Sequence, residues 1–189
     1  MKIFLFLYDK FSDFEIVQAL LILRENVLTT VGFEKGLVKS IGQLKVEAEI
    51  SIEELIIDEV DLLLIPGGEP KHFIRNKDFN EKIKVLNKKL QILDMKGKII
   101  AAICGGPTFL ANAGILDNKT CTASISEDER IFYKNSNLSE NDFVIDGNIL
   151  TAQGQAFTEF AVQLAKLCNT FETEKEMEEA IKWFRNVKD

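Results

Sequence analysis

The feature that most constrains the fold is a short apolar run that ends abruptly in a turn of small residues. Ile99 to Ile103 contains only apolar residues, which is typical of a strand that is buried on both faces. The turn Cys104-Gly105-Gly106-Pro107 follows, and Thr108 to Ala113 then reads as a helix. Pro107 suits the first turn of a helix, where a backbone N–H would lack a partner anyway. The sequence therefore predicts a strand, a sharp turn and a helix, with Cys104 on the turn.

Cys104 has the surroundings of a nucleophile elbow, a turn that needs small residues two positions on either side of the nucleophile. Ala102 and Gly106 meet this requirement. Gly105 leaves room for a substrate to approach the backbone N–H that follows the cysteine. A helix N-terminus lowers the pKa of a thiol, which favours a reactive cysteine. Free cysteine is also among the most buried residue types, so a structural role fits the local pattern equally well.

Apolar runs and helical patterns alternate along the chain, which predicts an α/β fold with a largely parallel sheet. With 189 residues, we expect one domain that spans residues 1–189. The expected strands are 2–8, 27–33, 61–65 and 99–103, the expected helices are 13–25, 80–94, 108–113, 156–167 and 174–184, and hairpins are expected over 37–50 and 144–150. We expect the last helix to cover a face of the sheet. In the first helix, four apolar residues recur at helical spacing and are expected to face the sheet: Phe14, Val17, Leu20 and Leu21.

Three features are expected at the carboxyl ends of parallel strands, where sites form in such sheets. Glu15 follows the first strand, Gly67-Gly68 follows a middle strand, and Cys104 follows another. Taken alone, Glu15 is most simply a solvated carboxylate in the first turn of a helix. The glycine pair predicts either a nest of backbone N–H groups or an ordinary turn. Their convergence at one sheet edge favours a functional site.

Composition narrows the classes of partner. The net charge of −7 and the pI of about 4.9 argue against nucleic acid, and no apolar run approaches a membrane-spanning length. Three scattered cysteines and a single histidine, His72 in an expected loop, show neither a disulfide framework nor metal-ligand spacing. We therefore expect a cytoplasmic protein without a metal ion or other cofactor.

Four segments, in this order, resemble the DJ-1/PfpI (ThiJ/PfpI) superfamily, which is related to class I glutamine amidotransferases. The segments are FSDFE around Glu15, DLLLIPGG, AAICGGPTFLANAGIL around Cys104, and DGNILTAQGQAFTEFA from Asp146. The resemblance implies a flavodoxin-like three-layer sandwich, in which a mostly parallel sheet is flanked by helices. It also implies an elbow cysteine at Cys104, a carboxylic acid at Glu15 that touches its sulfur, backbone donors at Gly68 and Gly105, and a homodimer.

The resemblance changes the interpretation of Glu15. A carboxyl group that is buried beside a thiolate stays protonated, because desolvation and like charge both raise its pKa. It then donates a hydrogen bond that stabilises the thiolate, which is the nucleophilic form. We expect the other two cysteines, Cys121 and Cys168, to be structural.

The sequence departs from the protease-like members at the positions that would supply a histidine. Gly105 stands directly after the cysteine, and Ser124 stands where other members carry a histidine. Because cysteine proteases use a Cys–His pair, peptidase activity is not expected. The first hypothesis is a cysteine-dependent hydrolase or lyase that acts on a small electrophile, such as a reactive carbonyl. The alternative is a redox-responsive stress protein or chaperone-like protein without turnover.

Overall fold

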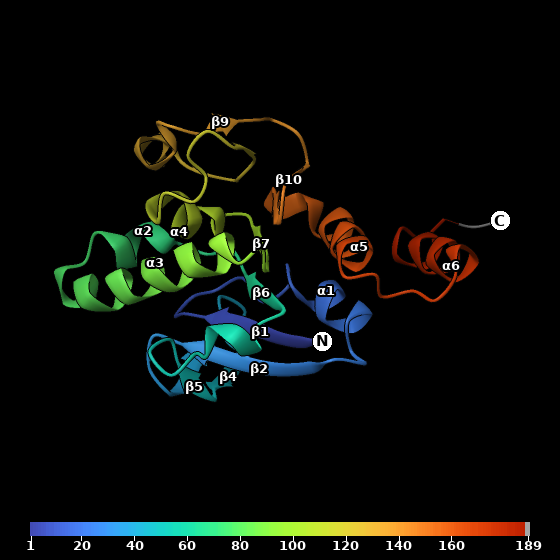
Figure 1. The fold of residues 1–189 in the computed structure, drawn as a ribbon, viewed down its shortest axis with the longest axis horizontal. Coiled ribbons are helices and arrows are strands. Elements are labelled where there is room, and N and C mark those ends of the chain that lie inside the picture. The colour runs from blue at the N-terminus through green and yellow to red at the C-terminus, as the bar shows by residue number, and fades with distance from the viewer. Residues whose placement is uncertain (188–189) are drawn as a thin grey trace.

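The computed structural model describes residues 1–187, and its central element is a seven-stranded sheet with the order β10-β11-β7-β6-β1-β2-β5 (Figure 1). Its strands are β1 (Lys2–Leu7), β2 (Val27–Gly32), β5 (Ile50–Ser51), β6 (Leu62–Ile65), β7 (Ile99–Ile103), β10 (Phe143–Asp146) and β11 (Ile149–Ala152). Every neighbouring pair is parallel except β10 and β11, which form an antiparallel hairpin. The predicted α/β fold with a mostly parallel sheet is confirmed.

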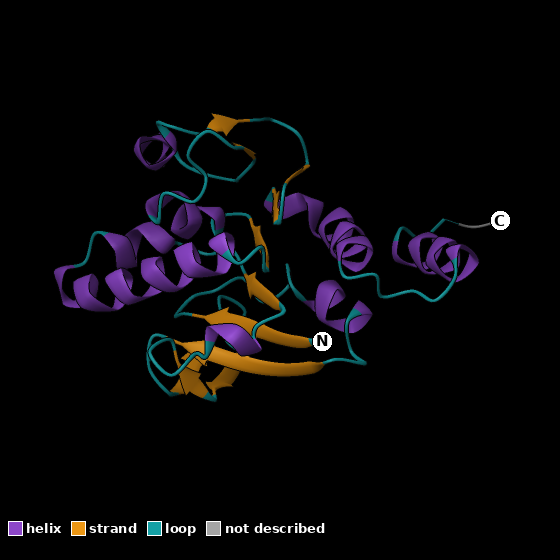
Figure 2. Cartoon of the chain, in the orientation of Figure 1, coloured by secondary structure: helices purple, strands orange, loops and turns teal. Residues whose placement is uncertain are grey.

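Helices flank the sheet on both sides (Figure 2). The helices are α1 (Val17–Ile22), α2 (Pro70–Ile74), α3 (Asn80–Met95), α4 (Pro107–Asn112), α5 (Phe157–Leu167) and α6 (Glu174–Phe184). The helices α1 and α5 pack against each other, whereas α2, α3 and α4 pack together on the other side of the sheet (Figure 1). Four short 3-10 helices lie in the connections: η1 (Ile57–Glu59), η2 (Lys77–Phe79), η3 (Glu127–Tyr133) and η4 (Gly154–Ala156). The three-layer sandwich is therefore confirmed.

Two small strand pairs lie outside the main sheet. The strands β3 (Gly36–Lys39) and β4 (Lys45–Ala48) form the expected antiparallel hairpin, and β8 (Thr120–Cys121) pairs with β9 (Asn137–Leu138). The β3–β4 strands end earlier than the sequence predicts, because Leu44 N donates to the side-chain Oγ of Ser40 at 3.0 Å rather than to its carbonyl oxygen. Residues 40–44 therefore form a broad loop at the tip of the hairpin, and this loop contributes to the site.

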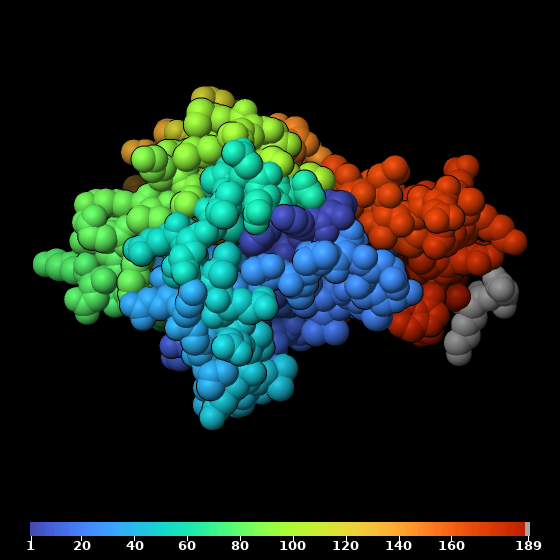
Figure 3. Space-filling view, turned by 60° about the horizontal axis from the view of Figure 1, so that its bottom comes forward, coloured from blue at the N-terminus to red at the C-terminus, as the bar shows by residue number. Residues whose placement is uncertain are grey.

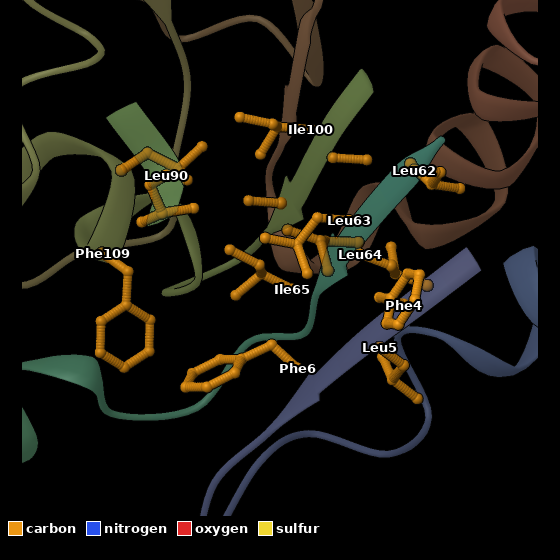
Figure 4. Packing of buried hydrophobic residues seen from close by; sticks show 14 of the residues in the cluster. Phe4, Leu5, Phe6, Leu62, Leu63, Leu64, Ile65, Leu90, Ile100 and Phe109 are labelled. Atoms are coloured by element: carbon orange, nitrogen blue, oxygen red, sulfur yellow. The ribbon is translucent and has the colours of Figure 1, made fainter. Parts of the chain in front are cut away.

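The core lies between the sheet and its helices (Figure 4). All residues of β6 are buried, as are Ile100 to Ile103 of β7, because parallel strands are covered on both faces. Phe6 of β1 meets Phe109 of α4 edge to face, with ring centroids 5.7 Å apart. Burying one such side chain stabilises the fold by about 1.5–3 kcal/mol. The core thus holds rigid the strand ends from which the site is built.

The first helix differs from the sequence-based expectation. Asp13 does not start it, because its carboxylate accepts a hydrogen bond from Ser40 Oγ at 2.7 Å, and α1 begins only at Val17. The expectation that four apolar residues face the sheet is wrong for three of them: Phe14, Val17 and Leu21 are exposed, and only Leu20 packs against the core. The buried face is formed instead by Ile16, Ala19, Ile22 and Leu23.

The last helix also differs from the expectation. Instead of covering the sheet, α6 lies beyond α5 at one end of the molecule (Figures 1 and 3). None of its residues is fully buried, and Trp183 is 69% exposed. Arg185 Nε donates to Glu159 Oε1 of α5 at 2.7 Å, which ties the end of α6 to the body. Among residues 1–187, no helix is long and apolar enough to span a membrane.

Candidate active site

Cys104 lies on the turn between β7 and α4, as the sequence predicts. Its φ of +60° lies in the left-handed region, which is uncommon for a residue other than glycine. The Cys104 N–H donates to the Ala152 carbonyl oxygen of β11 at 2.8 Å, and the Cys104 carbonyl oxygen accepts from Ser124 N at 2.9 Å. These bonds to two separate segments hold the backbone in this strained conformation.

The glycines around Cys104 are required by close backbone contacts. A Cβ atom on Gly105 would collide with the Gly68 carbonyl oxygen, and one on Gly106 would lie 2.7 Å from the Pro66 carbonyl oxygen. Gly68 itself has a φ of +132°, which favours glycine. The glycine turns after β6 and β7 therefore pack directly on each other, and this contact brings Gly68 to the cysteine.

Glu15 lies inside the molecule, and the interpretation as a solvated carboxylate in the first turn of a helix is wrong. It precedes α1 by two residues and is only 2% exposed. Its side chain forms a hydrogen bond with the Cys104 side chain, and Gly67 N donates to its Oε2 at 2.9 Å.

Burial controls the protonation of the Glu15–Cys104 pair. Desolvation is the main cause that raises the pKa of Glu15, against hydrogen bonds from Cys104, Gly67 and Ser12 that lower it. Desolvation and the Glu15 charge raise the pKa of Cys104 to about 12. The two groups therefore titrate as a coupled pair.

Two backbone groups favour negative charge on the sulfur. Hydrogen bonds from the backbone of Gly105 and of Gly68 lower the pKa of Cys104. Tyr8 Oη supports this arrangement by donating to the carbonyl oxygens of Gly67 at 2.7 Å and Pro66 at 2.9 Å. These hydrogen bonds from β1's neighbour Tyr8 hold the turn that carries Gly68 in place.

Gly154 packs against both Cys104 and Glu15, and it was not among the predicted site residues. A Cβ atom there would lie 2.9 Å from Cys104 Sγ and 3.1 Å from Glu15 Oε1. The Gly154 N–H donates to Ser124 Oγ at 2.9 Å. Ser124 therefore lies at the site, but its hydroxyl group accepts from the backbone of Gly154. The sequence could not show that Gly154 contacts Cys104, because a glycine after a strand is common in turns.

Cys104 lines a cleft of about 640 Å³. Its walls come from the loop after β1, from the tip of the β3–β4 hairpin, and from Gly68 and Glu69. The hairpin is held to that loop by the hydrogen bond from Ile41 N to the Phe11 carbonyl oxygen, 2.9 Å. Sequence reasoning missed the hairpin residues, because no local pattern shows that the hairpin folds back onto the first loop. The volume is in the range of small-molecule pockets.

The remaining histidine and cysteines lie away from this chemistry. His72 is exposed and lies in α2 rather than in a loop, and its Nδ1 is 2.7 Å from Glu69 Oε2. Cys121 is buried in β8, and burial raises its pKa to about 11. Cys168 follows α5, and burial likewise raises its pKa to about 11. Within residues 1–187, no group of three or more His, Cys, Asp or Glu residues is placed to hold a metal ion.

Comparison with known proteins agrees with this architecture. A solved structure of a DJ-1 superfamily protein from Agrobacterium tumefaciens superposes with a TM-score of 0.82 at 22% identity, over 100% of both chains. The chain is 26% identical to Deglycase TK1284 of Thermococcus kodakarensis, covering 81% of this chain and 90% of that protein. It is 29% identical to the uncharacterized protease YoaZ of Bacillus subtilis, covering 90% of this chain and 84% of that protein. The model of the DJ-1/PfpI family matches residues 1–167, and the chain therefore belongs to the DJ-1/PfpI family.

Proposed function

We propose that this protein is an enzyme that uses Cys104 to attack a small electrophile, such as a reactive carbonyl compound. The observation that carries this proposal is the buried Glu15 side chain hydrogen-bonded to Cys104, which itself lines an open cleft. A strained backbone and a buried acid are costly to maintain in a purely structural turn. Perturbed titratable groups in a cleft are typical of functional sites.

In the reactive state, Glu15 holds the proton and Cys104 is a thiolate. Burial favours the neutral form of both groups, and the backbone hydrogen bonds of Gly68 and Gly105 are what favours charge on the sulfur. The thiolate adds to an aldehyde carbon, a C–S bond forms, and the electron pair of the C=O bond moves to oxygen. Glu15 then protonates that oxygen, which gives a neutral hemithioacetal and a carboxylate base.

For a 2-oxoaldehyde, the same residues complete a balanced reaction. The Glu15 carboxylate removes the proton from the former aldehyde carbon, and the electron pair of that C–H bond gives an enediol as the neighbouring ketone oxygen is protonated. Glu15 then returns its proton to the neighbouring carbon while the hydroxyl group on the former aldehyde carbon loses its proton and becomes the C=O group of a thioester, so the two oxygens exchange one proton and the carbons another. Water hydrolyses the thioester, releases a 2-hydroxy acid and restores the thiol of Cys104. The net reaction adds one water molecule and needs no oxidant.

The names of relatives are compatible with this proposal. The Thermococcus protein is called a deglycase, a name that fits chemistry on carbonyl-derived adducts. The Bacillus protein is called an uncharacterized protease. A peptidase needs a partner that protonates the leaving amine, but His72 is exposed and is bound by Glu69. Small electrophiles therefore fit the site better than peptides.

Turnover of methylglyoxal by the wild type and by Cys104→Ser tests the proposal. We expect the wild type to form lactate, Cys104→Ser to lose turnover, and the control Cys168→Ser to retain it. Equal turnover by Cys104→Ser would refute the proposal. Oxidation of Cys104 by peroxide, in a protein without turnover on any 2-oxoaldehyde, would favour the redox-responsive alternative.

We also propose that the chain forms a homodimer through the exposed face of α1. Phe14, Val17 and Leu21 lie on one face of this segment, with exposed fractions of 54%, 57% and 40%. An apolar stripe of this kind is typical of an interaction surface. Light scattering should give twice the mass of one chain, and Val17→Asp should shift it toward the monomer. A monomeric wild type at micromolar concentration would contradict the proposal.

A further inference from the structure

We infer that the substrate of the Cys104 cleft carries a negatively charged group, such as a carboxylate, and that Lys10 and Lys39 select it. This inference rests on the proposed attack by Cys104 and adds the substrate class. Both lysines line the same cleft as the cysteine. They come from different elements, because Lys10 follows β1 and Lys39 ends β3.

The backbone holds these two lysines side by side. Lys10 N donates to the Lys39 carbonyl oxygen at 2.7 Å, and Lys39 N donates to Asp9 Oδ1 at 3.2 Å. Lys10 has a φ of +63°, a conformation that is costly without such support. On the other side, the Lys10 carbonyl oxygen would lie 2.8 Å from a Cβ atom on Gly68. The loop that carries Lys10 therefore spans from the hairpin to the glycine that binds the sulfur.

The carboxylates and the lysines that line the cleft differ in whether they have partners in the protein. Of its two wall carboxylates, Asp9 accepts a hydrogen bond from the backbone, and Glu69 is bound to His72. Neither the Lys10 nor the Lys39 ammonium group has an ion-pair partner among residues 1–187. Two unpaired cations in the lining of a small cleft attract an anionic ligand, whereas the Asp9 and Glu69 carboxylates in the same lining repel one. This attraction is local, since the net charge of the whole protein is −7 and repels anions.

The positive charge of the two lysines also offsets negative charge at the sulfur of Cys104. In the proposed reactive state Cys104 is a thiolate, and its negative charge would repel an anionic substrate if nothing compensated for it. Lys10 and Lys39 supply positive charge in the lining of the same cleft. Their ammonium groups bind the remote anionic group of the substrate, and its electrophilic carbon is left to meet Cys104.

Alkylation of Cys104 by iodoacetate and by iodoacetamide tests this inference without any need for turnover. The two reagents are close in size and differ in charge, and each forms a C–S bond as iodide leaves. The rates at Cys104 are measured by peptide mapping, and the iodoacetate-to-iodoacetamide ratio is divided by the same ratio for free cysteine. We expect this normalised ratio to exceed one in the wild type and to fall as salt is raised from 20 to 500 mM, by roughly threefold or more.

The lysine variants locate the effect. We expect Lys10→Gln and Lys39→Gln each to lower the normalised ratio by roughly twofold to fivefold, with little change in the iodoacetamide rate. Lys88→Gln on α3 changes the net charge equally but lies outside the cleft, and it should leave the ratio unchanged. A normalised ratio of one or less in the wild type would overturn the inference, and so would an equal effect of Lys88→Gln. A Cys104 that reacts with neither reagent would instead refute the proposed function.

Discussion

Replacing Glu15 distinguishes a neutral hydrogen-bond donor from an ionised neighbour, because the two states shift the thiol pKa of Cys104 in opposite directions. Glu15→Gln retains a donor at nearly the same position without a charge. Glu15→Asp withdraws the carboxyl group by one methylene, roughly 1.5 Å, which is enough to lose a contact of about 3 Å. The side chain is 2% exposed, so water replaces the lost contact poorly.

The expected magnitude follows from the hydrogen bond. A hydrogen bond to a charged group contributes about 1.5–3 kcal/mol, and one pKa unit corresponds to about 1.4 kcal/mol. If Glu15 is a neutral donor to the thiolate, Glu15→Asp raises the thiol pKa by roughly one to two units. Glu15→Gln changes it by less, because the amide N–H still donates. If Glu15 is ionised, Glu15→Gln removes a repulsive charge and lowers the thiol pKa, whereas Glu15→Asp keeps the charge and only moves it away from the sulfur.

The assay is the rate of iodoacetamide labelling at Cys104 as a function of pH, measured by peptide mapping. Mapping is needed because Cys121 and Cys168 also become thiolates at high pH. The control is Glu69→Gln, which removes a carboxylate from the wall of the same cleft and should leave the pH midpoint almost unchanged. A midpoint that falls in Glu15→Gln would refute the role of Glu15 as a proton donor. Superimposable curves would show that the two side chains do not interact.

Three further predictions concern stability and packing. Burial raises the pKa of Glu15, so the stability that depends on its protonation is fully present below its unfolded-state pKa and is lost as pH rises through the folded-state pKa. In urea unfolding, the free energy of unfolding of Glu15→Gln should therefore rise relative to that of the wild type between pH 4 and pH 7, by about 1.4 kcal/mol per unit of pKa shift. A difference that does not change with pH would contradict this. Gly154→Ala places a methyl group 2.9 Å from Cys104 Sγ, so it should destabilise the protein by about 1–3 kcal/mol and slow the labelling of Cys104. Unchanged labelling would show that the backbone near Gly154 shifts to accommodate the methyl group. Phe6→Ala in the fully buried core should cost about 3–5 kcal/mol in urea unfolding, against about 0.5 kcal/mol or less for the exposed Ile131→Ala, and equal losses would show that the core is not where the structure places it.

Local pattern in the sequence determined the strands and the turn of the elbow. The apolar runs of β6 and β7 have one stable environment, the interior of a parallel sheet, and the small residues after them permit only a tight turn. These features depend on neighbours within a few positions, so they can be predicted without the fold. The family could be predicted for the same reason, because its motifs are local.

The tertiary structure alone decided how Glu15 and the cleft are placed. Asp13 and Ser40 lie 27 residues apart, and their hydrogen bond holds the segment before α1 against the hairpin, in a conformation in which Phe14 is exposed and Glu15 is buried. No periodicity in the sequence records such a contact, and the pattern of apolar residues alone favoured the opposite face of the helix. The same docking of the hairpin on the first loop brings Lys39 beside Lys10. Composition and spacing therefore defined the strand ends, whereas long-range hydrogen bonds decided which side chains meet there.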